Sequence, residues 1–124
     1  MPELIYKDEA YEVTGICMEV HNHLGPGLLE IIYKEAIEWE LDKRFIQYER
    51  EKEYPVHYKE TLLRKKFYAD FVVYDKIILE AKAKESFCNE DITRVINYLK
   101  LSGCKLALLV NFGKSRLEIK RLVN

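Results

Sequence analysis

The sequence predicts an α/β (α+β) fold, a mixed β-sheet flanked by helices, with the element order ααβββαββ. Three observations predict it. Apolar residues recur at helical spacing in the first 43 residues and again near residue 95, while the middle of the chain changes to a strand-like pattern. A predicted helix separates the third strand from the fourth, which favours a parallel crossover inside the sheet. The length of 124 residues suits one compact domain spanning residues 1–124.

Three segments carry helical patterns. The first predicted helix covers roughly Asp8 to His23, and Gly25-Pro26-Gly27 ends it because proline cannot continue the hydrogen-bond ladder. The second runs from about Leu28 to Lys43 along a broad apolar stripe. The third is marked by apolar residues between Ile92 and Leu99 and is closed by Gly103.

Five segments read as strands. The first covers Phe45 to Tyr58, where Pro55 favours an edge position or a bulge. Lys59-Glu60 forms the expected hairpin tip, and the second strand covers about Leu62 to Tyr74. The remaining expected strands are Ile77 to Ala83 after a turn at Asp75-Lys76, the apolar run Lys105 to Asn111, and Arg116 to Val123 beyond Gly113.

Composition and charge exclude several classes of protein. No apolar run approaches the roughly 18 residues of a membrane span, and residues 1–9 lack the basic start of a signal peptide. Three distant cysteines argue against a disulfide framework and a thiolate zinc site. We therefore expect a cytoplasmic protein. The net charge of −1 offers no global basic field, but the chain from Ile92 onward carries +6 and the first 91 residues −7. An ordinary solvated charged face explains this asymmetry equally well.

Charged residues interrupt two of the predicted strands. Glu80 and Lys82 lie two apart and share a face, and Asp70 lies nearly opposite Glu80 if the second and third strands pair as a hairpin. Two converging carboxylates repel each other unless a cation or a proton sits between them, and their oxygens suit Mg²⁺. A neighbouring lysine would complete a hydrolytic site. The alternative is an ordinary cross-strand salt bridge.

Alternation also predicts which residues of the second strand share a face. We expect one face to hold four apolar side chains and the other to hold Asp70 with two neighbours. The two expected sets are Phe67, Ala69, Phe71 and Val73 on one face, and Tyr68, Asp70 and Val72 on the other.

The pattern Asp70…Glu80-x-Lys82 resembles the signature of the PD-(D/E)xK phosphodiesterase superfamily. Within it, the segment 27–33, Gly-Leu-Leu-Glu-Ile-Ile-Tyr, is similar to the defining motif of the small GxxExxY family. Segments 23–27, 68–71 and 109–113 are similar to that family too, so that the resemblance covers about residues 8–123.

The resemblance implies a restriction-endonuclease-like fold and a role for each site residue. Asp70 and Glu80 would bind Mg²⁺ or Mn²⁺, and Lys82 would be the catalytic lysine. Glu30 matches an acid that the superfamily often supplies from its first core helix, where it binds metal directly or through water. Alternatively, Glu30 is an ordinary acid in the first turn of a helix.

The sequence departs from related nucleases at one position. They often carry Gln-x-x-x-Tyr on the helix after the lysine strand, whereas here Tyr98 fits but Arg94 occupies the glutamine position. Arg94 could contact a phosphate or pair with Glu80, but it cannot replace an amide that both donates and accepts hydrogen bonds. We expect nucleic-acid contacts from Arg94, Tyr98, Lys120 and Arg121.

The sequence therefore predicts a metal-dependent nuclease that hydrolyses phosphodiester bonds of nucleic acid, with DNA as the expected polymer, through a metal-activated water. No membrane is involved, and we expect either structure-selective cleavage or a homodimer mate or partner protein that supplies specificity. Two alternatives stay open. One is a catalytically weak or inactive nuclease-fold module for binding or assembly, and the other is a hydrolase of small phosphoesters such as nucleotides.

Overall fold

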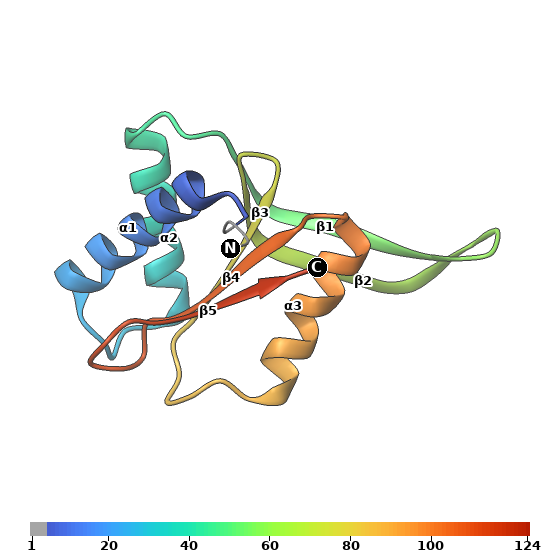
Figure 1. The fold of residues 1–124 in the computed structure, drawn as a ribbon. Coiled ribbons are helices and arrows are strands. Elements are labelled where there is room, and N and C mark those ends of the chain that lie inside the picture. Colours follow the sequence, from blue (N-terminus) through green and yellow to red (C-terminus); the bar gives the residue numbers. More distant parts are fainter. Residues whose placement is uncertain (1–4) are drawn as a thin grey trace, which may run out of the picture.

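A computed structural model describes residues 5–124 of the chain. Helices α1 (Lys7–Leu24) and α2 (Glu30–Lys43) lie on one face of a five-stranded sheet, and α3 (Asn89–Ser102) lies on the other (Figure 1). Residues 1–4, part of the segment read for a signal peptide, lie outside the described residues. The strands are β1 (Tyr48–Tyr58), β2 (Thr61–Val73), β3 (Ile77–Lys82), β4 (Leu106–Asn111) and β5 (Glu118–Val123).

The sheet is mixed, as the sequence predicts. Its strand order is β1-β2-β3-β4-β5, and the α3 crossover makes β3 and β4 parallel while the other neighbouring pairs are antiparallel. The predicted order ααβββαββ is therefore confirmed. Within residues 5–124, no helix is long and apolar enough to span a bilayer.

The predicted ends of the first and third helices and the predicted position of Pro55 are also confirmed. Gly25 has φ +66 and donates its N–H to the carbonyl of His21 at the end of α1. Gly103 ends α3 in the left-handed conformation that glycine adopts without steric cost. Pro55 lies in β1, which is an edge strand, and the β1–β2 register shifts between Pro55 and His57.

One predicted boundary is wrong by three residues: β1 begins at Tyr48 rather than at Phe45. Phe45 has φ +57 and donates its N–H to the carbonyl of Asp42, so that this residue ends α2 and cannot begin a strand. The third helix, marked from Ile92 in the sequence, begins at Asn89. The other predicted boundaries agree with the structure or differ by one or two residues; α2 begins at Glu30 rather than Leu28, for example.

Two apolar cores hold the layers together. Helices α1 and α2 bury one sheet face through a cluster that includes Ile16, Ile37, Phe71, Leu79 and Leu108. Helix α3 buries the opposite face through a smaller cluster that includes Ile78, Val95, Leu99, Ala107 and Leu109. Alternate residues of β3 and β4 belong to different cores, so these central strands are covered on both faces.

The expected alternation along β2 is wrong. Phe71 and Val73 pack toward α1 and α2, whereas Phe67 and Ala69 pack toward α3. The face changes at Asp70. On the neighbouring strand, Glu51 lies between the register pairs that flank Asp70 and has φ +53, an irregular conformation for a strand residue. This local kink re-aims the side chain of Asp70 toward the α1–α2 layer.

The segment after β4 anchors the chain that follows β3. Asn111 is fully buried, and its side chain accepts hydrogen bonds from the N–H groups of Lys84 and Gly113 while donating to the carbonyl of Lys84. Phe112 donates its N–H to the carbonyl of Lys82 at 2.8 Å. These bonds fix the end of β3, where Lys82 lies.

We expect Gly113→Ala to lower the free energy of unfolding by about 1–3 kcal/mol. A Cβ at this position would lie 2.4 Å from the backbone nitrogen and oxygen of Lys84, which cannot move without breaking the Asn111 contacts. Gly15→Ala is the matched control. Apart from the neighbouring backbone of α1 itself, no atom of residues 5–124 lies within 4 Å of its Cβ position, so this change should stabilise by about 0.4–1 kcal/mol. Urea unfolding measures both effects, and equal effects of the two substitutions would contradict the expectation.

Candidate active site

The β2–β3 ladder stops where the two acidic residues begin. The last register pair is Phe71 with Leu79, and the next opposed positions are Asp70 and Glu80, as the hairpin argument predicts. Here side chains replace the main-chain bonds. The backbone N–H of Asp70 donates to Glu80 Oε1 at 2.6 Å, and the N–H of Ala81 donates to Asp70 Oδ2 at 2.9 Å. The two carboxylates thus lie between the diverging strand ends, which we call the strand gap.

Both carboxylates in the strand gap are buried. Asp70 is 5% exposed and Glu80 is 2% exposed. Burial raises the pKa of Glu80 well above its ordinary value of 4.5, and the negative charge of Asp70 raises it further. The Asp70 N–H and the lysines at positions 82 and 34 act in the opposite sense without cancelling the shift. The strand gap is therefore a place where a positive charge is favoured.

A lysine from α2 occupies one side of this gap. Lys34 Nζ lies 2.8 Å from Asp70 Oδ1 and 2.9 Å from Glu30 Oε2, and its side chain is only 13% exposed. Burial alone would lower the pKa of Lys34, but hydrogen bonds and charge from Asp70 and Glu30 outweigh it and raise the pKa. The ammonium thus bridges two of the three predicted metal ligands. Glu30 is thus connected to Asp70 by the ammonium of Lys34, which contacts both carboxylates.

Lys82 lies at the end of β3, in register with Asn111, and shares the α3-facing side of the strand with Glu80. It is half-buried. Among residues 5–124, no acidic group lies within ion-pair distance of its ammonium. The side chain is therefore available to a ligand placed beside Glu80.

The sheet register separates the two predicted basic contacts on β5. Glu80 pairs with Leu109, which pairs with Lys120, so that Lys120 lies in the row of Glu80, two strand spacings or about 10 Å away. Its side chain is exposed on the face that Glu80 uses. Arg121 points to the opposite face and donates to the carbonyl of Ile5, so it does not join Lys120 in one basic patch.

Helix α3 places Arg94 and Tyr98 beside the strand gap. Tyr98 is 3% exposed and its ring packs edge-on against Phe67, so its ring faces are not available for stacking on a base. Burial raises the pKa of the Tyr98 phenol, and the negative charge of Glu80 raises it further. The suggested pairing of Arg94 with Glu80 is wrong: the guanidinium pairs with Glu90, one turn earlier, at 3.6 Å.

Tyr33 fixes the start of α2 and hence the position of Glu30. Its hydroxyl donates to the carbonyl of Gly25 at 2.6 Å and accepts from the N–H of Leu28 at 3.2 Å. Its fully buried ring stacks on the ring of Phe112, and the backbone N–H of Phe112 donates a hydrogen bond to the carbonyl of Lys82. Tyr33 thereby connects the loop before α2 with the end of β3.

The donor set fits a hard divalent cation. Asp70 and Glu80 present adjacent, buried carboxylate oxygens, and Mg²⁺ typically takes one or two protein carboxylates and completes its shell with water and substrate. Within the described residues, no cluster of three or more acidic, histidine or cysteine side chains is assembled around a common point. Glu30 is kept from such a cluster because Lys34 lies between it and Asp70.

The raised pKa of Glu80 gives a pH-dependent expectation for the metal-free protein. The folded state holds the proton of the Glu80 carboxyl more tightly than the unfolded state does. Protonated Glu80 therefore stabilises the fold fully below pH 4.5, and this stabilisation is lost as the pH rises through the folded pKa of Glu80. Glu80→Gln mimics the protonated form and removes this loss. Between pH 4.5 and pH 9, we expect the free energy of unfolding of Glu80→Gln to rise relative to that of the wild type by more than about 1.4 kcal/mol.

Urea unfolding in EDTA at several pH values measures this difference. Glu85→Gln, at an exposed position outside the strand gap, is the matched control. A difference between Glu80→Gln and wild type that stays constant with pH would contradict the expectation.

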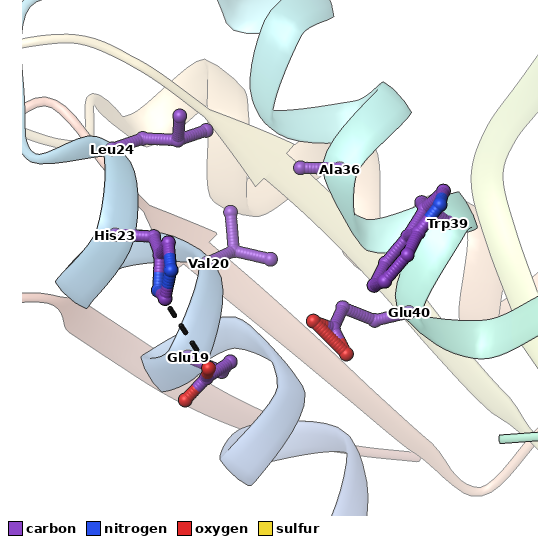
Figure 2. Close-up of a pocket in the computed structure, with 7 residues that line it drawn as sticks. All are labelled: Glu19, Val20, His23, Leu24, Ala36, Trp39 and Glu40. Atoms are coloured by element: carbon purple, nitrogen blue, oxygen red, sulfur yellow. Dashed lines mark ion pairs between the residues drawn. The ribbon is translucent and has the colours of Figure 1, made fainter. Parts of the chain in front are cut away.

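A separate groove lies between α1 and α2, and its lining includes none of Glu30, Asp70 and Glu80. Figure 2 shows Val20 and Leu24 of α1 facing Ala36 and Trp39 of α2 across a space of about 430 Å³. Its charged lining is mainly acidic, with Glu19 and Glu40 at the rim. Such a lining disfavours a phosphodiester, so the groove does not extend the candidate active site.

Sequence reasoning missed Lys34, the residue that bridges the site. The spacing of four between Glu30 and Lys34 on α2 predicts an ion pair along the helix, and the structure contains it at 2.9 Å. No local pattern indicates that the same ammonium also reaches Asp70, which is 36 positions away. That contact depends on the packing of α2 and on the kink that re-aims Asp70.

Comparison with known proteins gives a family match and a structural similarity. A family model described as the PD-(D/E)XK nuclease superfamily matches residues 7–122. The crystal structure of SSO0001 is similar with a TM-score of 0.59 and 18% sequence identity, covering 96% of this chain and 57% of that chain. At that identity, the structural similarity shows a shared fold alone. The comparison with curated proteins gives no match.

Proposed function

Because the chain belongs to the PD-(D/E)XK nuclease superfamily, we propose that it is a metal-dependent nuclease that hydrolyses phosphodiester bonds of nucleic acid. The observation that carries this proposal is the strand gap, in which the buried carboxylates of Asp70 and Glu80 each accept a hydrogen bond from the backbone of the opposite strand. Lys82 shares the face of Glu80 and has no acidic partner within the described part of the chain. A pair of acids next to an uncommitted lysine is suited to phosphodiester hydrolysis.

Each residue has a distinct task in this proposal. Asp70 and Glu80 would hold Mg²⁺ or Mn²⁺, which when bound supplies Lewis-acid polarisation of the scissile phosphate. The ammonium of Lys82 orients the attacking water or stabilises negative charge that develops on a phosphoryl oxygen. Glu30 is an auxiliary ligand on the opposite side of Asp70.

A finer assignment, membership of the GxxExxY family, rests on Gly27, Glu30 and Tyr33. The hydrogen bonds of Tyr33 give this spacing a physical reason. The hydroxyl of Tyr33 bonds to two points of the loop before α2, at Gly25 and Leu28. It therefore holds the first turn of α2, in which Glu30 lies. A phenylalanine in its place would lose both bonds.

We propose DNA as the polymer, bound through its phosphates. Exposed Lys120 lies in the row of Glu80, and Arg94 lies on α3, which covers the same face of the sheet. In this proposal both residues contact a backbone that passes Lys82. Phosphate contacts give strong salt dependence and little sequence preference. A second copy of the chain or a partner protein would then supply specificity.

A second candidate function is a binding or assembly module with weak or no turnover. It is favoured by Arg94, which pairs with Glu90 instead of supplying an amide, and by Lys34, which already neutralises part of the acidic site. Such a module would bind nucleic acid or a partner without consuming it.

The deciding experiment incubates the protein with supercoiled plasmid, single-stranded RNA and a nucleotide, each with Mg²⁺, Mn²⁺ or EDTA. Metal-dependent cleavage of plasmid or RNA supports the nuclease, and the cleaved polymer identifies the substrate. Hydrolysis of the nucleotide alone would replace the nuclease with a small-phosphoester hydrolase. Binding of plasmid without cleavage under every metal condition would overturn the proposal in favour of the binding module.

A further inference from the structure

Lys34 occupies a position that a metal ion would need. Its ammonium lies within hydrogen-bond distance of oxygens from both Glu30 and Asp70, at 2.9 and 2.8 Å. Any cation that is bound by these two oxygens together must lie between them, where Nζ already is. An ammonium and a divalent cation cannot share that point, because like charges at such a distance repel strongly.

The remaining oxygens of the carboxylate pair are also partly engaged. Asp70 Oδ2 accepts the N–H of Ala81, and Glu80 Oε1 accepts the N–H of Asp70. The backbone donors are neutral and keep the carboxylates in place, so they are compatible with a bound cation. Lys34 is the charged partner of Asp70, and its contacts with Asp70 and Glu30 are therefore what metal binding must break.

We propose that Lys34 is an internal counter-ion that competes with the divalent metal for Asp70 and Glu30. This inference rests on the proposed function, since it concerns the metal site of the nuclease. Lys34 keeps the metal-free site assembled by offsetting the repulsion between its acids. It also keeps Glu30 from the metal until the ammonium moves away. The divalent-ion concentration at which the site fills is thus set by a residue that is not itself a ligand.

The test measures Mn²⁺ binding to the purified protein by isothermal titration calorimetry. We expect Lys34→Met to bind Mn²⁺ about tenfold more tightly than the wild type, because the competing charge is gone while an unbranched apolar side chain remains. Lys34→Arg retains a cation and should bind Mn²⁺ within about threefold of the wild type. Lys43→Met, an exposed lysine in the last turn of the same helix, is the matched control and should leave the affinity unchanged.

A second measurement uses the wild-type protein, since Lys34→Met leaves Asp70 without its charged partner and lowers the stability of the metal-free fold. The side-chain ¹⁵Nζ resonance of Lys34 is followed by NMR during titration with Mg²⁺. We expect a signal typical of a hydrogen-bonded ammonium without Mg²⁺, and a large shift or loss of protection as the site fills.

The outcomes separate this inference from the proposed function. If the wild type binds Mn²⁺ and Lys34→Met binds it no more tightly, or if the Lys34 resonance is unchanged at saturating Mg²⁺, the competition is overturned and the metal site remains. If neither protein binds Mn²⁺, the metal site is overturned and the competition with it. Binding by Lys34→Met alone supports both.

Discussion

Lys82→Met is expected to lower the rate of nucleic-acid cleavage by a factor on the order of 10²–10⁴ while leaving the fold and the Mn²⁺ affinity nearly unchanged. The ammonium is placed beside Glu80 on the same face of β3, where it would act on the attacking water or on charge at the phosphate. Because Lys82 has no acidic partner in residues 5–124, its removal breaks no ion pair. Single-turnover cleavage of plasmid measures the rate, and urea unfolding measures the stability.

Lys100→Met is the matched control, because Lys100 is an exposed lysine in the last turn of α3. It should cleave at the wild-type rate. Equal rates for Lys82→Met and wild type would exclude Lys82 from the reaction. A parallel loss of cleavage and Mn²⁺ binding in Lys82→Met would assign the residue to the metal site rather than to the chemistry.

Asp70→Asn is expected to weaken Mn²⁺ binding by about 100-fold or more and to abolish cleavage, since it removes a negative charge from the metal site. The new amide still carries an oxygen that can accept the N–H of Ala81, so the strand gap is retained. The same change separates Lys34 from its partner, and the metal-free protein should become less stable. Calorimetric titration with Mn²⁺ and urea unfolding test the two effects.

Asp75→Asn is the control for this substitution, because Asp75 lies in the turn between β2 and β3 and hydrogen-bonds with Gln47 at the surface. It should bind Mn²⁺ like the wild type. Wild-type affinity in Asp70→Asn would remove Asp70 from the ligand set, and loss of affinity in both variants would point to a general disturbance of the hairpin.

The fold is predictable from the sequence because its signals are local and repeated. Helical spacing before residue 43, a change of period afterwards and glycines at positions 25 and 103 mark the elements, and the α3 crossover makes one strand pair parallel. The opposition of Asp70 and Glu80 is also predictable, since it needs only the hairpin turn near residue 75 and antiparallel pairing.

The finer arrangement of the site is not predictable in this way. A strict two-residue alternation cannot anticipate the kink at Glu51, which turns Asp70 toward α2. The second contact of Lys34 joins residues far apart in sequence through helix packing. By contrast, strand alternation does separate Lys120 from Arg121, because neighbours on a strand point to opposite faces.

The cross-strand bonding of Asp70 and Glu80 has an evolutionary consequence. Each acid also serves the scaffold, because its carboxylate satisfies a backbone N–H that the diverging strands leave without a ladder partner. A relative that had lost the proposed nuclease activity would still be under selection to keep both acids for folding. Their presence in a relative therefore does not distinguish a working enzyme from a pseudoenzyme. The position that distinguishes the two is Lys82, because selection for stability alone does not require a lysine there.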